Sequence, residues 1–246
     1  MKVICVGMNK TGTKSITKAL RLLGFTVFDW EEQIFDFLDH WLDVFQNGAK
    51  PDVKRVYQNA DAVVDIPGNF FYEEILESFP ECKVVLSERE EDSWVKSVTH
   101  HFENMVVSDS YISYIISMLS ATAAKITYVT DCHLTAFFGS LNPKSTYVFR
   151  KRHRIHNQRV KSIVPADKLL VYNVKQGWKP LCDFLGCTAP AIPFPHENIE
   201  AEITRMPLDM TRTGRQVKRE IQNSVFVIFC VLVMVVAIIV AICISY

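Results

Sequence analysis

The chain has 246 residues, and its 27 lysines and arginines balance its 27 aspartates and glutamates. This balance does not favour nucleic acid as a partner, so any specificity for anions must be local. Residues 1–210 have a globular composition and are enough for one sizeable α/β domain with a buried core.

The seven cysteines are odd in number and have no zinc-type spacing. Cys5 lies in a predicted strand, and Cys230 and Cys243 lie in an apolar tail. This pattern favours a reducing compartment and buried thiols. No secretory signal peptide is expected, because the first apolar run is only about five residues long and leads directly into a glycine-containing turn.

Residues 1–15 predict a phosphate-binding unit. Residues 2–6 have the β-branched, apolar composition of a buried parallel strand, 7–12 form a turn, and 13–23 have helical spacing. Backbone N–H groups at the start of such a helix attract an anion, the helix dipole adds positive potential, and a lysine adds a full charge. The expected ligand is therefore a phosphorylated nucleotide.

The spacing in this turn is close to that of a Walker A loop but does not match it. Gly7 and Gly12 have the required interval, yet Thr13 stands before Lys14 and Ser15, so the lysine is one residue out of register. An ordinary βα turn with surface lysines is the simplest alternative.

The run Lys-Thr-Gly-Thr at residues 10–13 resembles the loop of sulfotransferases that use 3′-phosphoadenylyl sulfate. Lys14 departs from the second threonine usual in that family. The resemblance implies a catalytic and cofactor-binding role for Lys10. It also implies that the 5′-phosphosulfate is bound by Lys10, Thr11, Gly12, Thr13, Lys14 and Ser15.

Strands and helices alternate through the rest of the globular part. We expect strands at 25–28, 60–65, 83–87 and 168–174, and helices at 33–45, 70–79, from Glu90, 144–163 and 177–186. This order predicts an α/β fold with a parallel sheet and helices on both faces. The resemblance, which extends to about Asn198, implies the sulfotransferase version of the P-loop NTPase-like fold.

Arg89 stands at the exit of the strand at 83–87, and Ser97 follows eight residues later. Sulfotransferases have an arginine and a serine with this separation at the 3′-phosphate site, so the resemblance implies that Arg89 and Ser97 bind that phosphate. A guanidinium fork suits a dianion because it can donate two parallel hydrogen bonds. The alternative is a surface cation. The family's glycine-rich, lysine-bearing loop near the C-terminus is not recognisable.

Asp65 follows the strand at 60–65, where doubly wound sheets bind their ligands. The resemblance places a catalytic residue in this turn, and a carboxylate there could accept a proton from an acceptor hydroxyl or amine. The family's better-known branches use His or Glu. Asp65 could instead cap the turn before Gly68.

Two segments carry no specific motif. Residues 105–140 are apolar and irregular, and we expect either an acceptor pocket or lid, or part of the core. The basic stretch 144–163 is expected to present a solvated cationic face.

Residues 225–244 are twenty consecutive uncharged, apolar residues. A helix of this length is about 30 Å long and matches the hydrocarbon core of a bilayer. The preceding cations are Arg212, Arg215, Lys218 and Arg219, and the positive-inside rule therefore places the domain in the cytosol. The expected protein is single-pass and tail-anchored, with a domain at 1–210, a basic juxtamembrane linker at 211–223 and a transmembrane helix at 224–245.

Taken with the resemblance, these features predict a membrane-anchored sulfotransferase that requires no metal. It would move a sulfuryl group from 3′-phosphoadenylyl sulfate to a hydroxyl or amine acceptor. Two alternatives remain. One is a P-loop kinase or NTPase that would use Lys14 and Ser15 on the phosphates and Asp65 to organise magnesium. The other is a non-catalytic nucleotide-binding membrane protein.

Overall fold

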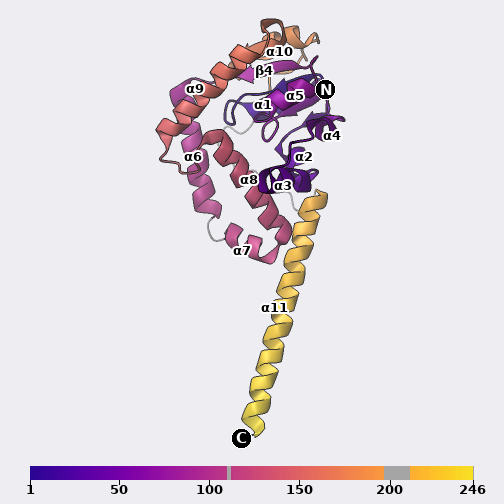
Figure 1. The fold of residues 1–246 in the computed structure, drawn as a ribbon, viewed down its shortest axis with the longest axis vertical. Helices are drawn as coiled ribbons and strands as arrows, with labels where there is room; N and C mark the ends of the chain where they lie inside the picture. The colour runs from indigo at the N-terminus through magenta and orange to yellow at the C-terminus, as the bar shows by residue number, and fades with distance from the viewer. Residues whose placement is uncertain (110–111, 197–210, 246) are drawn as a thin grey trace.

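The computed structural model describes residues 1–109, 112–196 and 211–245 (Figure 1). The strands are β1 Val3–Cys5, β2 Val27–Phe28, β3 Ala62–Val64, β4 Lys83–Ser87 and β5 Leu169–Tyr172. The helices are α1 Thr13–Leu22, α2 Trp30–Phe35, α3 Leu38–Asn47, α4 Val53–Tyr57, α5 Tyr72–Ser78, α6 Glu91–Asp109, α7 Ile112–Leu119, α8 Ala121–Phe138, α9 Thr146–Ile163, α10 Trp178–Leu185 and α11 Arg212–Ser245. Short 3₁₀ segments lie at Ala166–Lys168 and Val174–Gln176.

The five strands form one parallel sheet in the order β2-β3-β1-β4-β5. Val3 of β1 lies opposite Ala62 of β3 on one side and Lys83 of β4 on the other. From β1 the chain passes to the edge strand β2, returns to β3 beside β1, and then crosses to β4 and β5 on the other side of β1. The point between β1 and β4 is therefore a topological switch point, where ligands bind in open α/β sheets.

Alternation along the strands directs side chains into two cores, one on each face of the sheet. Ile4 and Val63 pack with α2–α5, α8 and α9, whereas Val3 and Ala62 pack with α1 and α10. The predicted α/β architecture, a parallel sheet with helices on both faces, is confirmed.

The single helix predicted at 33–45 is two helices in the structure. The capping box of Asp29 and Glu32 starts α2 earlier than expected. The Trp41 indole donates to the Gln33 carbonyl at 2.9 Å, which takes the acceptor that a continuous helix would offer to the Phe37 N–H. The chain therefore breaks at 36–37 and turns into α3.

The expectation of irregular structure at 105–140 was wrong. Apart from residues 110–111, which lie outside the described part, the segment forms the end of α6 and then α7 and α8. Ser120 caps α8 by accepting from the Ala123 N–H at 3.1 Å, and Gly139 ends the helix with φ 78°. Phe137 and Phe138 are buried in the core beside Trp94, as the alternative reading of this segment expected.

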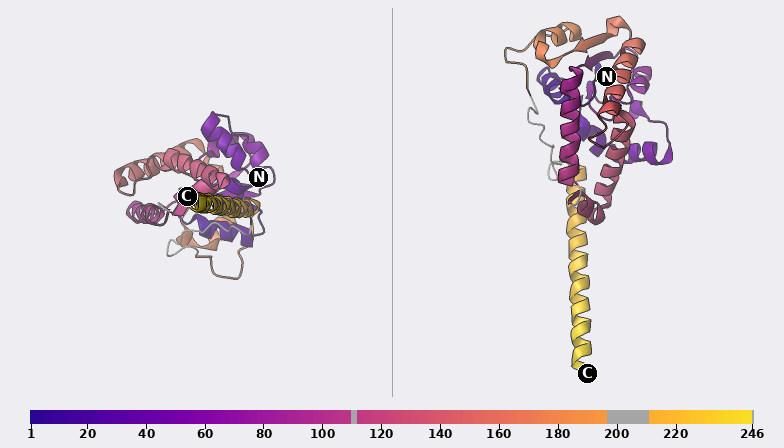
Figure 2. Two further views of the ribbon diagram at one scale, coloured as in Figure 1. Left: turned by 90° about the horizontal axis from the view of Figure 1, so that it is seen from below. Right: turned by 90° about the vertical axis from the view of Figure 1, so that its left-hand side faces the viewer.

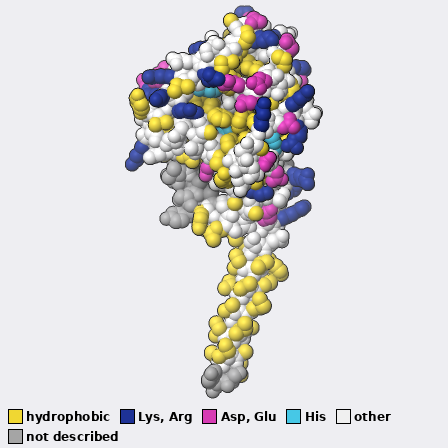
Figure 3. Space-filling view, viewed as in Figure 1, with side chains coloured by type: hydrophobic (Ala, Val, Ile, Leu, Met, Phe, Trp, Pro, Cys, Tyr) yellow, Lys and Arg dark blue, Asp and Glu magenta, His cyan; other side chains and the backbone are white. Residues whose placement is uncertain are grey.

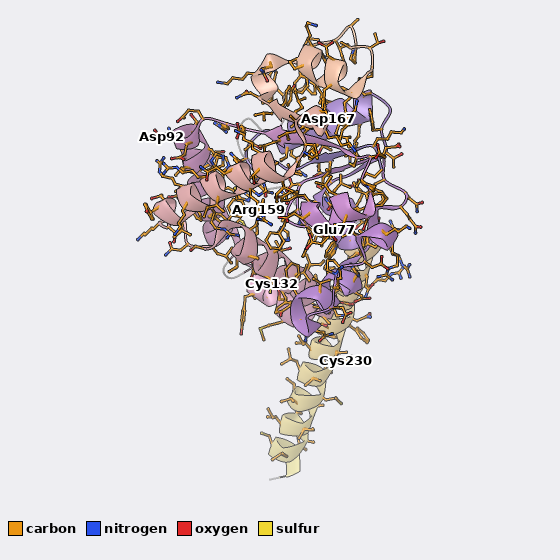
Figure 4. The ribbon with its side chains drawn as sticks, turned by 45° about the horizontal axis from the view of Figure 1, so that its top comes forward. Glu77, Asp92, Cys132, Arg159, Asp167 and Cys230 are labelled. Atoms are coloured by element: carbon orange, nitrogen blue, oxygen red, sulfur yellow. The ribbon has the colours of Figure 1, made fainter. Side chains whose placement is uncertain are left out.

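The basic stretch forms α9, and several of its exposed cations are paired with carboxylates on neighbouring helices. Arg154 forms a two-point ion pair with Glu91 of α6, and Arg159 forms another with Glu73 of α5, each at 2.6–2.7 Å. Figure 4 shows Arg159 directed from α9 toward α5. These contacts tie α9 across the helices that cover one face of the sheet.

The C-terminal helix α11 is continuous from Arg212 to Ser245 and extends away from the domain (Figures 1 and 2). Its later part is long and apolar enough to span a membrane and is not buried against the rest of the protein. Its first part is packed on the domain: Val217 is fully buried, and the Thr213 hydroxyl donates to the Phe35 carbonyl at 2.6 Å. Residues 212–223 of the stretch expected as a linker are thus helical.

Candidate nucleotide-binding site

The loop between β1 and α1 has an unusual backbone that only small or strained residues can adopt. Lys10 has φ 73° and Gly12 has φ 102°, both in the left-handed region. A Cβ on Gly12 would also lie 2.6 Å from the Val174 side chain, so glycine is required there. Left-handed residues within such a turn direct successive N–H groups to one side and form a concave anion-binding nest.

The loop is held against the end of β4 by close contacts. A Cβ on Gly7 would lie 1.9 Å from the Ser87 hydroxyl oxygen, so no side chain fits between them. The Thr11 hydroxyl donates to the Met8 carbonyl at 2.7 Å and lies 2.6 Å from the Ser87 hydroxyl. The side chain of Thr11 therefore supports the loop from the sheet, and its contribution to an anion would come from its backbone.

The helix that follows begins without a capping side chain. Gly12 is the N-cap of α1 and offers no oxygen to the first-turn N–H groups. These groups and the helix dipole favour an anion at this end. Lys10 adds a half-buried ammonium. Burial lowers the pKa of this ammonium, the charge of Asp65 raises it, and the charges of Arg89 and Lys14 lower it further. An anion bound here would stabilise the charged lysine.

Two contacts bring the region after β4 to this loop. The Arg89 guanidinium donates to the Lys10 carbonyl at 3.3 Å, and the Trp94 indole donates to the Asn9 carbonyl at 2.9 Å. The two predicted phosphate-binding segments, 79 residues apart between Lys10 and Arg89, are therefore adjacent. Ser97 lies half-buried one turn beyond Trp94, and within the described residues no hydrogen bond joins it to Arg89.

A cavity of about 360 Å³ opens beside Arg89. It lies at the carboxyl ends of β4 and β5 and is lined by Glu88, Arg89, Glu90, Val171, Tyr172, Asn173 and Gln176. Its volume lies within the range of small-molecule sites, roughly 300–1,000 Å³. The arrangement offers an anion-binding loop and an adjoining space large enough for part of a nucleotide.

Asp65 lies under the loop and is 4% exposed. Its side chain accepts hydrogen bonds from the Asn9 amide, from the Ile66 N–H at 2.8 Å and from the Thr13 hydroxyl at 3.3 Å. Burial raises its pKa to about 6, Lys14 opposes this shift, and Asp29 adds to it. The carboxylate thus positions both ends of the loop and also has a pKa suited to proton transfer near neutral pH.

Lys14 is turned away from the loop opening, toward carboxylates at the start of α2. Its ammonium lies 2.9 Å from Asp29 Oδ2 and 3.5 Å from Glu31 Oε2. Burial opposes the charge of Lys14, but Asp65, Asp29 and Glu31 together outweigh burial and raise its pKa. In this geometry Lys14 neutralises buried carboxylates. The Ser15 side chain is buried in the first turn of α1.

Sequence reasoning missed several residues that lie at or near the site. Asn9 and Asp29 were not identified because their roles depend on tertiary contacts with Asp65 and Lys14. His101 lies on α6, seven residues after Trp94 and so on the same helical face. Burial lowers the pKa of His101 to about 4, and the charge of Lys10 lowers it further, so the ring is neutral at pH 7. The available signal was its seven-residue spacing from Trp94, which places both residues on one face of α6.

Within the described residues, no group of three or more His, Cys, Asp or Glu side chains is arranged to hold a metal ion. The cationic character of the loop comes from Lys10 and Arg89, together with the N-terminus of α1.

A parallel sheet with an anion-binding loop at its switch point defines a class of proteins that bind phosphorylated nucleotides. The family described as "Sulfotransferase domain" matches residues 2–203. The chain therefore belongs to the sulfotransferase domain family, as the resemblance of its loop indicated. It is also similar to "Ava biosynthesis cluster protein M" of Aspergillus versicolor, at 29% identity over 221 residues that cover 80% of each chain.

Proposed function

We propose that the protein transfers a sulfuryl group from 3′-phosphoadenylyl sulfate to a hydroxyl or amine acceptor. The bond between sulfur and the bridging oxygen of the 5′-phosphate breaks, and a bond forms between sulfur and the acceptor oxygen or nitrogen. The acceptor loses its proton, and adenosine 3′,5′-bisphosphate leaves. Such a transfer depends mainly on positioning and on stabilising charge on the leaving phosphate.

The main support for this proposal is that Lys10 and Arg89 lie next to each other. Lys10 and the N–H groups of residues 11–15 would hold the 5′-phosphosulfate, and Arg89, with Ser97, would bind the 3′-phosphate. The 3.3 Å contact between Arg89 and the Lys10 carbonyl supports one ligand with phosphates at both positions. The chain's membership of the sulfotransferase domain family supports the same reading.

Asp65 is the proposed acceptor of the proton. Its raised pKa supports this role, because a carboxylate with a pKa near 6 is a stronger base than an exposed aspartate. Since the side chain is buried beneath the loop, the proton would reach it only if the acceptor group enters beside Asn9 and Thr13.

The P-loop kinase or NTPase alternative would require Lys14 on the phosphates. The ion pair of Lys14 with Asp29 argues against that role, because the ammonium would have to leave a buried carboxylate unpaired. A non-catalytic nucleotide-binding protein would keep the same contacts without turnover.

A thermal-shift panel on the full chain in detergent separates these three functions. A ligand that binds only the folded state raises the melting temperature. Adenosine 3′,5′-bisphosphate should stabilise the protein if the proposal is right, and Mg-ATP or Mg-GTP should do so if the protein is a kinase or NTPase. Stabilisation by Mg-ATP but not by the bisphosphate would contradict the proposal. Bisphosphate binding without sulfuryl transfer to any acceptor would favour the non-catalytic alternative.

We further propose that α11 anchors the protein in a membrane with the domain on the cytosolic side. The uncharged run at 225–244 and the cations that precede it support this arrangement. Protease added to intact microsomes should digest the domain. A domain protected until the vesicles are opened by detergent would reverse the orientation.

A further inference from the structure

The contacts between α11 and the domain determine which part of the domain lies level with the start of the apolar run. The Glu220 carboxylate accepts from the Ser120 hydroxyl at 2.6 Å and from the Thr122 N–H at 2.9 Å, at the start of α8. One helical turn later, the Ser224 hydroxyl donates to the Leu119 carbonyl at 2.8 Å. Val225, the first residue of the apolar run, follows immediately. The last residue of α7 therefore lies at the level where the candidate span begins.

The helix α7 lies across the base of the domain at this level (Figure 1). Its residues 112–119 include no charged side chain. Ile116 packs against the main core, but Tyr114, Ile115 and Met118 are 65%, 53% and 70% exposed. Figure 3 shows apolar side chains gathered at the base of the domain, beside the start of α11. Large apolar side chains grouped on one helical face mark an interaction surface.

We propose that Tyr114, Ile115 and Met118 of α7 dock on the lipid surface of the bilayer that α11 spans. This inference rests on the proposed membrane anchor. Its support is continuity: the surface lies beside the first exposed residues of the apolar run, Val225 and Phe226. A second copy of the chain is disfavoured as the occupant, because it would have to reach this face through the space that the bilayer fills.

The chemistry of α7 suits the boundary between headgroups and acyl chains. An uncharged helix with one exposed apolar face can bury that face in this region while its other face packs on protein. Tyr114 adds a ring that is apolar in its body and polar at its hydroxyl, the combination enriched at membrane interfaces. The domain would then contact the membrane at two places, α11 and α7.

Photocrosslinking in the full chain, reconstituted in phosphatidylcholine liposomes, tests this proposal. The photoreactive residue p-benzoylphenylalanine would replace Tyr114 or Met118 in separate variants. Tyr147, which is 78% exposed near the start of α9, provides the matched control. It lies beyond the far end of α8, and an 18-residue helix separates the two places by roughly 25 Å. Val231 in the apolar run reports insertion of α11.

Phospholipid adducts at Tyr114 and Met118, with a yield similar to that at Val231 and well above that at Tyr147, would support docking. Adducts at Val231 without adducts at Tyr114 or Met118 would overturn the docking of α7 and leave the anchor intact. A failure at Val231 would overturn the anchor and the docking together. Equal yields at Met118 and Tyr147, or a crosslink between two copies at Met118, would also overturn the proposal.

Discussion

Lys14 lies in an ion pair with the buried carboxylate of Asp29, with 2.9 Å between Nζ and Oδ2. Asp29 also caps the first turn of α2 by accepting from the Trp30 N–H. The lysine that comes nearest to a Walker position in the sequence is therefore engaged between two helices, whereas Lys10 stands in the loop itself. This difference separates the roles of the two lysines.

Replacement of Lys10 by alanine should impair nucleotide binding without affecting the fold. Loss of a charge-assisted contact to the 5′-phosphate should weaken adenosine 3′,5′-bisphosphate binding by about 1.5–3 kcal/mol, or abolish transfer. Isothermal calorimetry on the full chain in detergent measures this change. If Lys14→Ala abolished nucleotide binding and Lys10→Ala weakened it only slightly, the result would favour the kinase alternative.

Replacement of Lys14 by alanine should mainly reduce stability. It leaves the Asp29 carboxylate buried without its cation, which costs about 1–3 kcal/mol or more for a charged group. The melting temperature of the protein without nucleotide should fall, while bisphosphate affinity changes less than in Lys10→Ala. An unchanged melting temperature would contradict a structural role for this ion pair.

Replacement of Arg89 by alanine should discriminate between nucleotides. Because Arg89 would bind the 3′-phosphate, its loss should weaken adenosine 3′,5′-bisphosphate far more than adenosine 5′-phosphate, with Ser97→Ala smaller in the same direction. Calorimetry with both nucleotides gives the comparison, and Lys96→Ala, which removes an exposed cation next to Ser97 on α6, is the control. Equal losses for both nucleotides would make Arg89 a structural cation.

The raised pKa of Asp65 predicts opposite effects of pH on transfer and on stability. A base must be deprotonated, so the transfer rate should rise with pH through about 6. Between the ordinary value of 3.8 and about 6, the folded protein holds a proton that the unfolded chain has lost. The free energy of unfolding should therefore fall as pH rises through this window.

Asp65→Asn provides the test of both effects. The variant should lose transfer. Its free energy of unfolding, measured by chemical denaturation, should no longer fall as pH rises from 3.8 to about 6. A variant that retains transfer would exclude Asp65 as the base, and His101 would become the next residue to substitute.

Glu220→Ala should loosen the attachment of α11 to the domain. Although burial opposes its charge, hydrogen bonds from Ser120, Thr122 and Gln216 lower the pKa of Glu220 to about 2. Its contribution to stability is therefore present above its ordinary value of 4.5 and is lost as pH falls toward about 2. Glu220 accepts from the first-turn Thr122 N–H of α8, as a capping side chain does, so the substitution should cost about 0.5–2 kcal/mol, the range for loss of such a contact.

Hydrogen exchange of the full chain in nanodiscs measures this attachment. The amides in the first turn of α8 should exchange faster in Glu220→Ala than in the native protein. Glu103→Ala, which removes an exposed carboxylate on α6, serves as the control. Unchanged exchange in α8 would show that Val217 and the other buried contacts of α11 hold the helix without Glu220.

The sequence was sufficient to predict what depends on local pattern. Short runs of β-branched and apolar residues located the strands of the sheet, and the glycines and Lys10 located the loop, because strand composition and turn chemistry are encoded within a few residues. The pairing of Lys14 with Asp29 depends on how α1 and α2 pack, so the short segment around either residue carried no signal for it. The break between α2 and α3 was missed for the same reason, since it is stabilised by the Trp41 indole.

The unbroken path of α11, from its docked first turns through the apolar run, has a mechanical consequence. Helices longer or shorter than the local bilayer thickness tilt or deform the bilayer around them. Since α11 is continuous from Arg212 to Ser245, a tilt of the span would rotate the sheet and the candidate nucleotide-binding site as one body. In a bilayer, a change of membrane thickness that tilts the span would then change the angle of the loop around Lys10, and it would have to overcome the docking of α7.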